Sequence, residues 1–283
     1  MTSRFAPVAP LAIHRRLAEA GAIGEYHLLL AHQVLENPDA HRRFYREQLG
    51  WMLGKQRGEE VSLRDKARRK PYIIMDNSLI ELGFPLPLKD VIEAAEIVRA
   101  NVIVLPDVLG DRIQTLNLAA QSVEEIHELR ASSPYARKVK MLGVAQGKTF
   151  NDFFSCARDM IQTLGVEAIS IPRHAVAKIG SRVKLVEEVR KYGKPLHLLG
   201  FSDNLLDDFT ALSTMGVMGI DSALPIWYGL QGFELPTNPP IKADFGKRPK
   251  DYESQTEINS KVIINIRRVE RWASIAKDAR TRR

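Results

Sequence analysis

The sequence predicts an α/β fold, namely a (β/α)8 TIM barrel that forms one domain over residues 1–283, with a long loop before the C-terminal helix. From residue 71 onward, short apolar runs alternate with segments of helical periodicity. The runs are apolar throughout, which is typical of parallel strands that are covered on both faces. Gly165, Gly193 and Gly216 each stand just before an apolar run, at positions where helices commonly end.

Seven apolar runs are predicted to form strands. They lie at 26–31, 72–75, 102–105, 139–145, 168–171, 196–200 and 217–220. Helices are expected between them at 88–100, 111–130, 150–165, 181–193 and 204–216. A barrel needs eight strands, so we expect the remaining strand within the first seventy residues, where the pattern is poor. A doubly wound open sheet is the alternative architecture.

The C-terminal part differs from this alternation. Residues 229–255 are rich in Gly, Pro and charge and show no periodicity, and a loop of that length is usually functional. Apolar residues then recur every three or four positions from Ile258 to Ile275, which predicts an amphipathic helix. Ser254 and Glu257 have the spacing of a capping box, so we expect this helix to begin at Ser254.

The composition narrows the class of protein. The single cysteine, Cys156, excludes an internal disulfide framework and a cysteine-rich zinc site, and it lies in a helical apolar stripe that we expect to be core. No apolar run approaches the ~20 residues of a membrane span, and the first residues do not resemble a secretory leader. We therefore expect a cytoplasmic protein without a membrane partner.

The net charge of +7 favours a polyanionic partner such as nucleic acid. Much of the basic excess lies at 55–70, 242–250 and 267–283. Each cluster alone is equally well read as solvated surface.

Polar residues follow the predicted strands. In a barrel the carboxyl ends of the strands form one rim, and catalytic groups lie there. The residues at these ends are Asp76, Asn77, Asp107, Gln146, Gly147, Arg173, His174, Gly200 and Asp221. No metal-ligand spacing and no glycine-rich phosphate loop accompanies them. Such acids suit chemistry at a sugar carbon, where one carboxylate attacks and another moves the proton.

A structural reading of these acids is also open. An aspartate after a strand is often the N-cap of the next helix. Asp111 is a better cap candidate than Asp107, and no obvious helix start follows Asp76. His174 is read equally well as a structural or a functional histidine, and His27 and His32 receive no role.

Five segments resemble the tRNA-guanine transglycosylase superfamily, TIM-barrel enzymes that exchange guanine for a 7-deazaguanine. They occur in the family's order within residues 72–229, at predicted strand ends. The segments are "MDNS", "VIVLPD", "GVAQGKTFNDFFSCARDMIQTLGVEAISI", "HLLGFSDN" and "GIDSALP". The resemblance implies a nucleophilic Asp221 and an acid/base Asp76.

The same resemblance implies the base-binding residues and the mechanism. Asp107 and Gln146, with Gly147 and a backbone group near Gly200, would hold the base, and Asn77 would steady the sugar or the nucleophile. The reaction would be a double displacement through an aspartyl-linked intermediate. It would need no cofactor and no metal, because one glycosidic bond replaces another.

Departures from the family pattern favour its compact phage branch, the DNA 7-deazaguanine transglycosylases. The zinc-site cysteines after the nucleophile strand are absent, "SLIE" replaces a double glycine, and "PRH" replaces a glycine-rich turn. The expected partners are then DNA and a free 7-deazaguanine such as preQ0. The expected location is the host cytoplasm if a phage encodes the protein, and the role is protection of phage DNA from restriction.

We expect Lys247, Arg248, Lys250 and Arg173 to contact the nucleic acid. Three alternatives remain open. The protein could be a tRNA-guanine transglycosylase of the queuosine or archaeosine type, a non-catalytic nucleic-acid-binding barrel, or an unrelated barrel hydrolase or lyase that uses paired acids.

Overall fold

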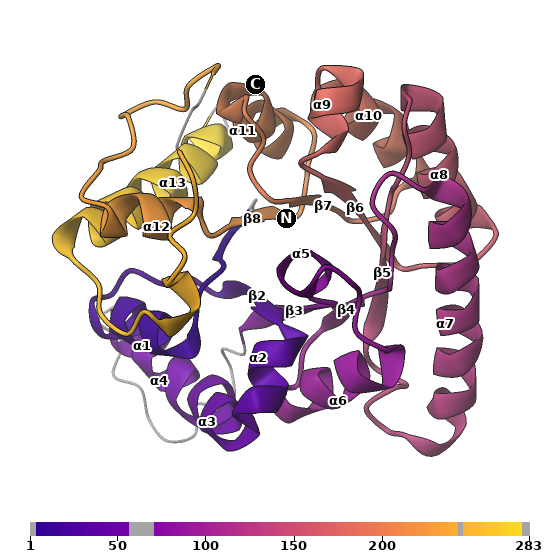
Figure 1. Cartoon of the computed structure of the whole chain (residues 1–283), viewed down its shortest axis with the longest axis horizontal. Coiled ribbons are helices and arrows are strands. Elements are labelled where there is room, and N and C mark those ends of the chain that lie inside the picture. Colours follow the sequence, from indigo (N-terminus) through magenta and orange to yellow (C-terminus); the bar gives the residue numbers. More distant parts are fainter. Residues whose placement is uncertain (1–3, 57–70, 243–245, 279–283) are drawn as a thin grey trace.

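The computed structural model describes residues 4–56, 71–242 and 246–278 (Figure 1). Most of the predicted basic cluster 55–70 lies outside the described residues, as do three residues of the 242–250 cluster and the last five of the basic tail. Within the described residues, no helix combines the length and the apolar character needed to cross a membrane.

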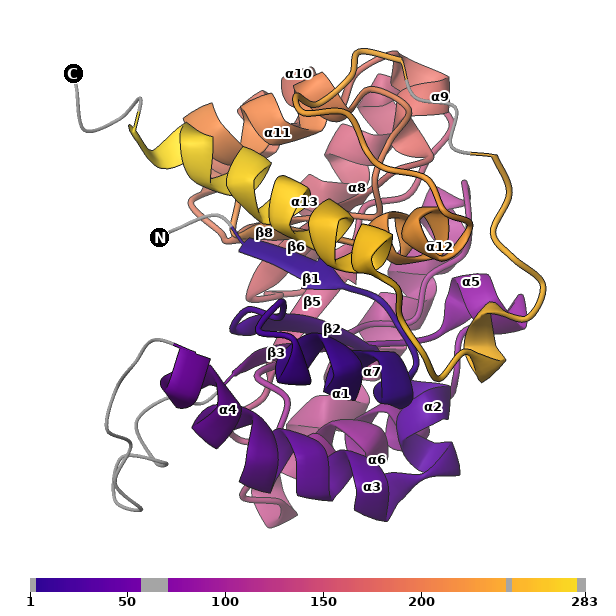
Figure 2. The same ribbon diagram turned by 90° about the vertical axis from the view of Figure 1, so that its left-hand side faces the viewer.

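Eight parallel strands form one nearly closed sheet, as expected for a (β/α)8 barrel. The strands are β1 Arg4–Pro7, β2 Tyr26–Leu30, β3 Tyr72–Asp76, β4 Val102–Val104, β5 Lys140–Val144, β6 Ala168–Pro172, β7 Leu196–Leu199 and β8 Gly219–Ser222. Their hydrogen-bonded order is β1-β8-β7-β6-β5-β4-β3-β2. β1 and β2, at the two ends of this order, lie next to each other (Figure 2).

All seven predicted strands are present, and the eighth is β1. It pairs in parallel with β8, with Ala6 opposite Asp221. The sequence pattern missed it because β1 is only four residues long and ends on a proline. The prediction that the missing strand lies within the first seventy residues is confirmed.

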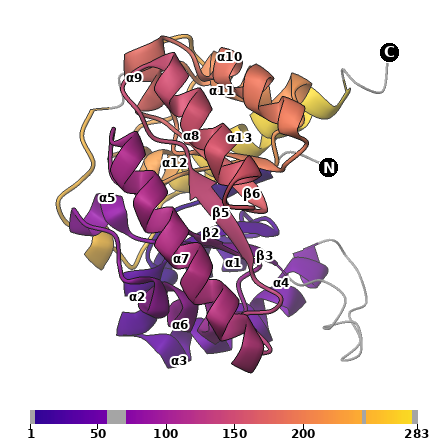
Figure 3. The same ribbon diagram turned by 90° about the vertical axis from the view of Figure 1, so that its right-hand side faces the viewer.

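Helices surround the strands (Figure 1). The longer ones are α1 Leu11–Glu19, α4 Leu49–Gln56, α6 Leu88–Val98, α7 Arg112–Ser132, α8 Phe150–Gln162, α10 Arg182–Val189, α11 Leu205–Thr214 and α13 Ser260–Asp278. The shorter ones are α2 Ala31–Glu36, α3 Pro38–Arg43, α5 Leu79–Leu82, α9 Ala175–Ile179 and α12 Leu224–Leu230. Single turns of other helix types are η1 Phe44–Gln48, η3 Arg190–Tyr192 and η4 Tyr252–Ser254. Figure 3 shows α7 and α8 packed side by side.

The core has two parts, because successive strand residues point to opposite faces. Tyr26, Leu28, Ile74 and Val102 belong to the smaller cluster inside the barrel. The larger cluster fills the space between the strands and the helices and contains Cys156, as predicted. The smaller cluster forms the floor under the rim of strand ends.

The predicted start of the C-terminal helix is wrong. Ser254 lies in η4, where its hydroxyl donates to the carbonyl of Asp251, and α13 begins six residues later at Ser260. Asn259 caps α13, since its Oδ1 accepts the N–H of Val262 at 3.1 Å. Residues that can cap a helix stand at both 254 and 259. The hydroxyl of Ser254 is bonded within η4, so it does not cap α13.

Candidate active site

Three carboxylates gather at the carboxyl ends of the strands. Asp76 ends β3, Asp107 follows β4 and Asp221 lies in β8. Their exposed fractions are 8%, 4% and 6%. Asp76 is two residues beyond Ile74 and Asp221 pairs with Ala6, so both lie on the face of the interior core. The fold therefore brings these predicted residues to one rim.

The environment of Asp76 favours its protonated form. Burial is the main reason that its pKa lies well above the ordinary value, and the charge of Glu81 adds to it. Asp221 and Asp107 repel the charged form of Asp76 as well. One contact opposes this, because the N–H of Ser78 donates to Asp76 Oδ1 at 2.7 Å. Asp76 is therefore suited to deliver a proton.

The turn after Asp76 is strained. Ser78 adopts the left-handed conformation with φ of 63°, although it is not a glycine. Its buried hydroxyl accepts the N–H of His32 at 3.3 Å, and Asn77 accepts the N–H of Leu79 at 3.0 Å. These contacts hold "MDNS" in the turn that leads into α5.

Asp221 is held through one of its oxygens. Oδ1 accepts from Nε2 of His197 at 2.8 Å and from the N–H of Gly200 at 3.1 Å. His197 lies in β7, is fully buried, and contacts the hydroxyl of Tyr26 through Nδ1 at 2.8 Å. His197 was not predicted from the sequence because it is inside a strand rather than at its end. The sequence feature that could have identified His197 is a single polar residue in an otherwise apolar strand.

Gly200 directly follows β7, and both of its backbone polar groups form hydrogen bonds. Its N–H donates to Asp221, and its carbonyl accepts from Arg182 at 2.9 Å. It has a φ of +72°, which glycine adopts without strain. The peptide groups at Gly200 therefore support the carboxylate of Asp221. The contact of a backbone group near Gly200 with the base stays a prediction.

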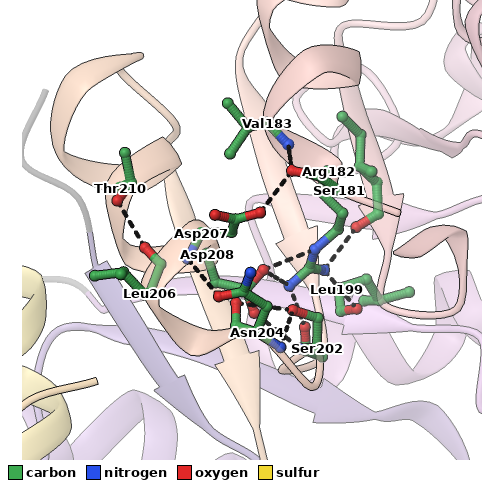
Figure 4. Close-up of polar contacts among 12 residues, drawn as sticks. Ser181, Arg182, Val183, Leu199, Ser202, Asn204, Leu206, Asp207, Asp208 and Thr210 are labelled. Atoms are coloured by element: carbon green, nitrogen blue, oxygen red, sulfur yellow. Dashed lines mark hydrogen bonds and ion pairs between the residues drawn. The ribbon is translucent and has the colours of Figure 1, made fainter. Parts of the chain in front are cut away.

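A buried ion pair fixes the ends of β6 and β7 (Figure 4). Arg182 of α10 is 1% exposed and lies 2.6 Å from Asp208 of α11. The guanidinium also donates to the carbonyl of Ile171 at 3.2 Å, and Asp208 accepts the N–H of Ser202 at 2.8 Å. Because Arg182 also holds Gly200, it connects two helices to the segment beside Asp221.

Asp107 and Gln146 form a carboxylate–amide pair. Asp107 accepts from Gln146 Nε2 at 2.6 Å and from Asn77 Nδ2 at 2.9 Å. Burial raises the pKa of Asp107 to about 6, and these two donors limit the rise. Gln146 Oε1 accepts from the N–H of Gly110 at 3.0 Å and lies 2.7 Å from His174 Nε2. These partners fix the amide, with its NH2 group toward the carboxylate.

Two other predicted site residues, Asn77 and Gly147, help to hold the structure around the pair of Asp107 and Gln146. Asn77 donates to Asp107 and to the carbonyl of Leu105 at 2.9 Å, so its described contacts orient Asp107 rather than Asp221. Gly147 allows a close approach, since a Cβ atom there would lie 2.4 Å from the Cβ of Asp152 in α8. Asp111 caps α7 by accepting the N–H of Gln114, as predicted.

The basic residues of the rim differ in their surroundings. Lys247, Arg248, Lys250 and Arg173 are all exposed, and they differ in their ion pairs. Arg248 pairs with Glu253, lies 4.0 Å from Glu81 Oε1, and stacks over Tyr252 at 4.6 Å. Arg248 is therefore already engaged by acids.

A cleft of about 300 Å³ lies beside Glu81. Its lining includes His32, Glu81, Leu82, Arg248, Lys250 and Tyr252. Burial raises the pKa of Glu81, which Arg248 opposes and Asp221 reinforces. The segment 248–253 therefore closes against α5, next to the acids of the rim.

Within the described ranges, no group of three or more His, Cys, Asp and Glu side chains is arranged to hold a metal ion. Comparison of the sequence with protein-family models gives no match, and comparison with curated proteins gives no significant match. The residues of the site are therefore the basis for assigning a function.

Proposed function

We propose that the protein is a DNA-guanine transglycosylase, which exchanges guanine in DNA for a 7-deazaguanine base through an aspartyl-linked intermediate. The observation that carries the proposal is the different surroundings of two buried carboxylates on one rim. Asp76 is surrounded by acids that favour its protonated form, and Asp221 accepts two hydrogen bonds on one oxygen. This arrangement supports one acid/base group and one nucleophile.

In the first half of the reaction, an oxygen of Asp221 attacks C1′ of the target nucleotide. The bond from C1′ to guanine breaks, and the departing base takes the electron pair and the proton of Asp76. A covalent ester between Asp221 and the sugar remains.

In the second half, a 7-deazaguanine takes the place of guanine. Asp76 accepts its N9 proton, N9 attacks C1′, and the bond to Asp221 breaks. Two inversions retain the configuration at C1′, as in retaining glycosidases.

The pair of Asp107 and Gln146 supports recognition of the base. A carboxylate oxygen can accept a second hydrogen bond besides the one it already holds, and Asp107 therefore has capacity for the N–H groups of a guanine edge. His174 and Gly110 keep the amide of Gln146 oriented for this task.

A nucleic acid is the proposed polymer because the rim also carries exposed cations. DNA is proposed rather than tRNA because the zinc-site cysteines of the tRNA enzymes are absent from the sequence. We assign the phosphate contacts first to Lys247, Lys250 and Arg173, since Arg248 is engaged by Glu253 and Glu81. The target nucleotide must leave the base stack, which costs a few kcal/mol in a duplex. Phosphate contacts by these side chains offset part of that cost.

The decisive experiment is nucleoside mass spectrometry of DNA after incubation with the protein and preQ0, with tRNA as the parallel substrate. Wild-type protein should insert the deazaguanine into DNA and not into tRNA. Asp221→Ala should abolish both the insertion and the covalent adduct, and Asp76→Ala should abolish the insertion. Asp111→Ala is the matched control, because this acid caps a helix and should leave the exchange intact.

Insertion into tRNA alone would show the tRNA-guanine activity instead. DNA binding with no exchange would identify a nucleic-acid-binding barrel. Undiminished adduct formation by Asp221→Ala would refute the assigned nucleophile.

The salt dependence of DNA binding tests the cationic rim. Replacing Lys247 and Lys250 by alanine should weaken binding and reduce the slope of log K against log salt by about 2, since each phosphate contact contributes about 0.9. Lys191→Ala is the control, because Lys191 precedes β7 at the other end of the barrel and pairs with Glu188. An unchanged slope in the double variant would place the DNA elsewhere.

A further inference from the structure

We propose that His197, oriented by Tyr26, is a positioning residue that holds the carboxylate of Asp221 for attack and stabilises it when it leaves the sugar. This inference rests on the proposed function. It is carried by a buried hydrogen-bond chain that joins three strands inside the barrel, from Tyr26 of β2 through His197 of β7 to Asp221 of β8.

The chain is short and enclosed. The hydroxyl of Tyr26 lies 2.8 Å from Nδ1 of His197, and Nε2 of His197 lies 2.8 Å from Oδ1 of Asp221. His197 is fully buried and Tyr26 is 1% exposed. The ring of Tyr26 also stacks on that of Tyr72, with 5.4 Å between the ring centroids, and this contact keeps the Tyr26 ring in place.

The partners decide which nitrogen of His197 carries the proton. An ionised carboxylate only accepts hydrogen bonds, so Nε2 carries the hydrogen that points to Asp221. In the neutral ring Nδ1 then accepts, and the hydroxyl of Tyr26 donates to it. Tyr26 thereby selects the tautomer in which His197 serves as a donor to Asp221.

The contacts on Asp221 assign different tasks to its two oxygens. His197 and the N–H of Gly200 both bind Oδ1, so Oδ2 is the oxygen for the bond to C1′. In the ester, Oδ1 becomes the carbonyl oxygen and still accepts both donors. When the bond from C1′ to Oδ2 breaks, the electron pair returns to the carboxylate and the same donors stabilise the charge.

His27 provides a matched control within the same barrel. It is equally buried, but it lies on the opposite face of β2 from Tyr26, toward the helices. Its ring contacts those of His14 and Tyr45. Replacing His27 by leucine therefore removes a buried strand histidine without touching Asp221.

The test compares His197→Leu, His197→Gln, Tyr26→Phe and His27→Leu with the wild type. The measured quantities are the rate of adduct formation with guanine-containing DNA and the KM of the 7-deazaguanine. His197→Leu should lower the rate on the order of 10- to 100-fold, as expected for a lost hydrogen bond to a charged group, with the KM of the base unchanged.

His197→Gln keeps an N–H donor near the position of Nε2 and should recover most of the rate. Tyr26→Phe should lower the rate by less than His197→Leu, and His27→Leu should remain within about twofold of the wild type. Equal rates for His197→Leu and the wild type would overturn the proposal. So would an equal loss in His197→Gln and His197→Leu, because that pattern indicates a packing role.

A measurement that does not depend on catalysis separates this inference from the proposed function. Nitrogen-15 NMR of histidine-labelled protein, with the His197 signals assigned from His197→Gln, reports the tautomer directly. The expected result is a proton on Nε2 and an accepting Nδ1, which Tyr26→Phe should disturb. A proton on Nδ1 in the wild type would refute the chain, whereas a wild type that forms no adduct would refute the proposed function only.

Discussion

Asp107 is the residue at which burial and hydrogen bonding most clearly oppose each other. Burial favours its neutral form, while the donors of Asn77 and Gln146 favour its carboxylate, and the result is a pKa of about 6. The carboxylate form accepts hydrogen bonds only, as recognition of the N–H groups of a guanine edge requires. Under the proposed function, ionisation of Asp107 near neutral pH would therefore be coupled to base binding.

We predict that binding of guanine or a 7-deazaguanine strengthens as the pH rises through 6. The carboxylate fraction of a group with this pKa grows about tenfold between pH 5 and pH 7, and the affinity should follow it. Isothermal titration calorimetry across this range measures the effect. Asp107→Asn should bind more weakly at pH 7 and lose the pH dependence, and an unchanged profile in that variant would assign the titration to another group.

At the scale of elements, α10 and α11 are joined by the buried pair of Arg182 and Asp208. The pair also holds the carbonyl of Gly200 and the N–H of Ser202, both in the segment after β7. Removing one partner leaves the other charge buried without compensation. The helices that cover the barrel thereby determine the conformation of a strand end.

We predict that Arg182→Met lowers the free energy of unfolding by about 3–5 kcal/mol, measured by urea denaturation. The double variant Arg182→Met with Asp208→Leu should recover part of this loss, because no unpaired charge remains. Lys191→Met removes an exposed pair with Glu188 and should change stability by less than about 1 kcal/mol. Additive losses in the double variant would mean that the two residues do not act as a pair.

The start of α13 gives a second prediction at this scale. Asn259 accepts the N–H of Val262 and also donates to the carbonyl of Gly229 in α12, so it fixes both the helix start and its neighbour. Asn259→Ala should lower the unfolding free energy by about 1 kcal/mol or somewhat more. Ser254→Ala should lower the unfolding free energy by less. A larger loss for Ser254→Ala than for Asn259→Ala would instead favour a helix start at Ser254, as the sequence pattern predicted.

For the whole molecule, a buried histidine cluster links stability to pH. His14 contacts the hydroxyl of Tyr45 through Nδ1 and donates from Nε2 to the carbonyl of Pro7, and His27 packs against both rings. Burial lowers the pKa of His14 to about 4 and that of His27 to about 3, each below the ordinary 6.5. The unfolded chain therefore binds more protons than the folded one between pH 6.5 and these values.

We predict that this cluster reduces stability as the pH falls from about 6.5 toward 4. Each histidine contributes up to about 1.4 kcal/mol per pH unit in this window. Asp107 has a raised pKa in the folded protein, so it stabilises the fold as the pH falls and opposes the histidines. The informative quantity is therefore the difference in unfolding free energy between the wild type and His27→Leu at each pH. That difference should change by up to about 1.4 kcal/mol per pH unit, and a constant difference would show that His27 does not change its protonation on unfolding.

The sequence was informative where local pattern controls structure. Continuous apolar runs predicted seven strands, and the acids and the amide after them predicted Asp76, Asp107, Gln146 and Asp221 as neighbours on one rim. Strand β1 escaped prediction because four residues provide too little periodicity. The start of α13 was misplaced because two adjacent segments both carry capping residues, and tertiary packing selected the second.

The amino-acid sequence by itself determined the alternation of strands and helices and the chemical character of the strand ends, because these depend on residues close together in the chain. Only the tertiary structure decided which partners each carboxylate has. His197 reaches Asp221 from β7, Tyr26 reaches His197 from β2, and Arg182 holds Gly200 from a helix. Such contacts arise from closure of the barrel, which brings the hydroxyl of Tyr26 to within 2.8 Å of the ring of His197, 171 positions away in the sequence.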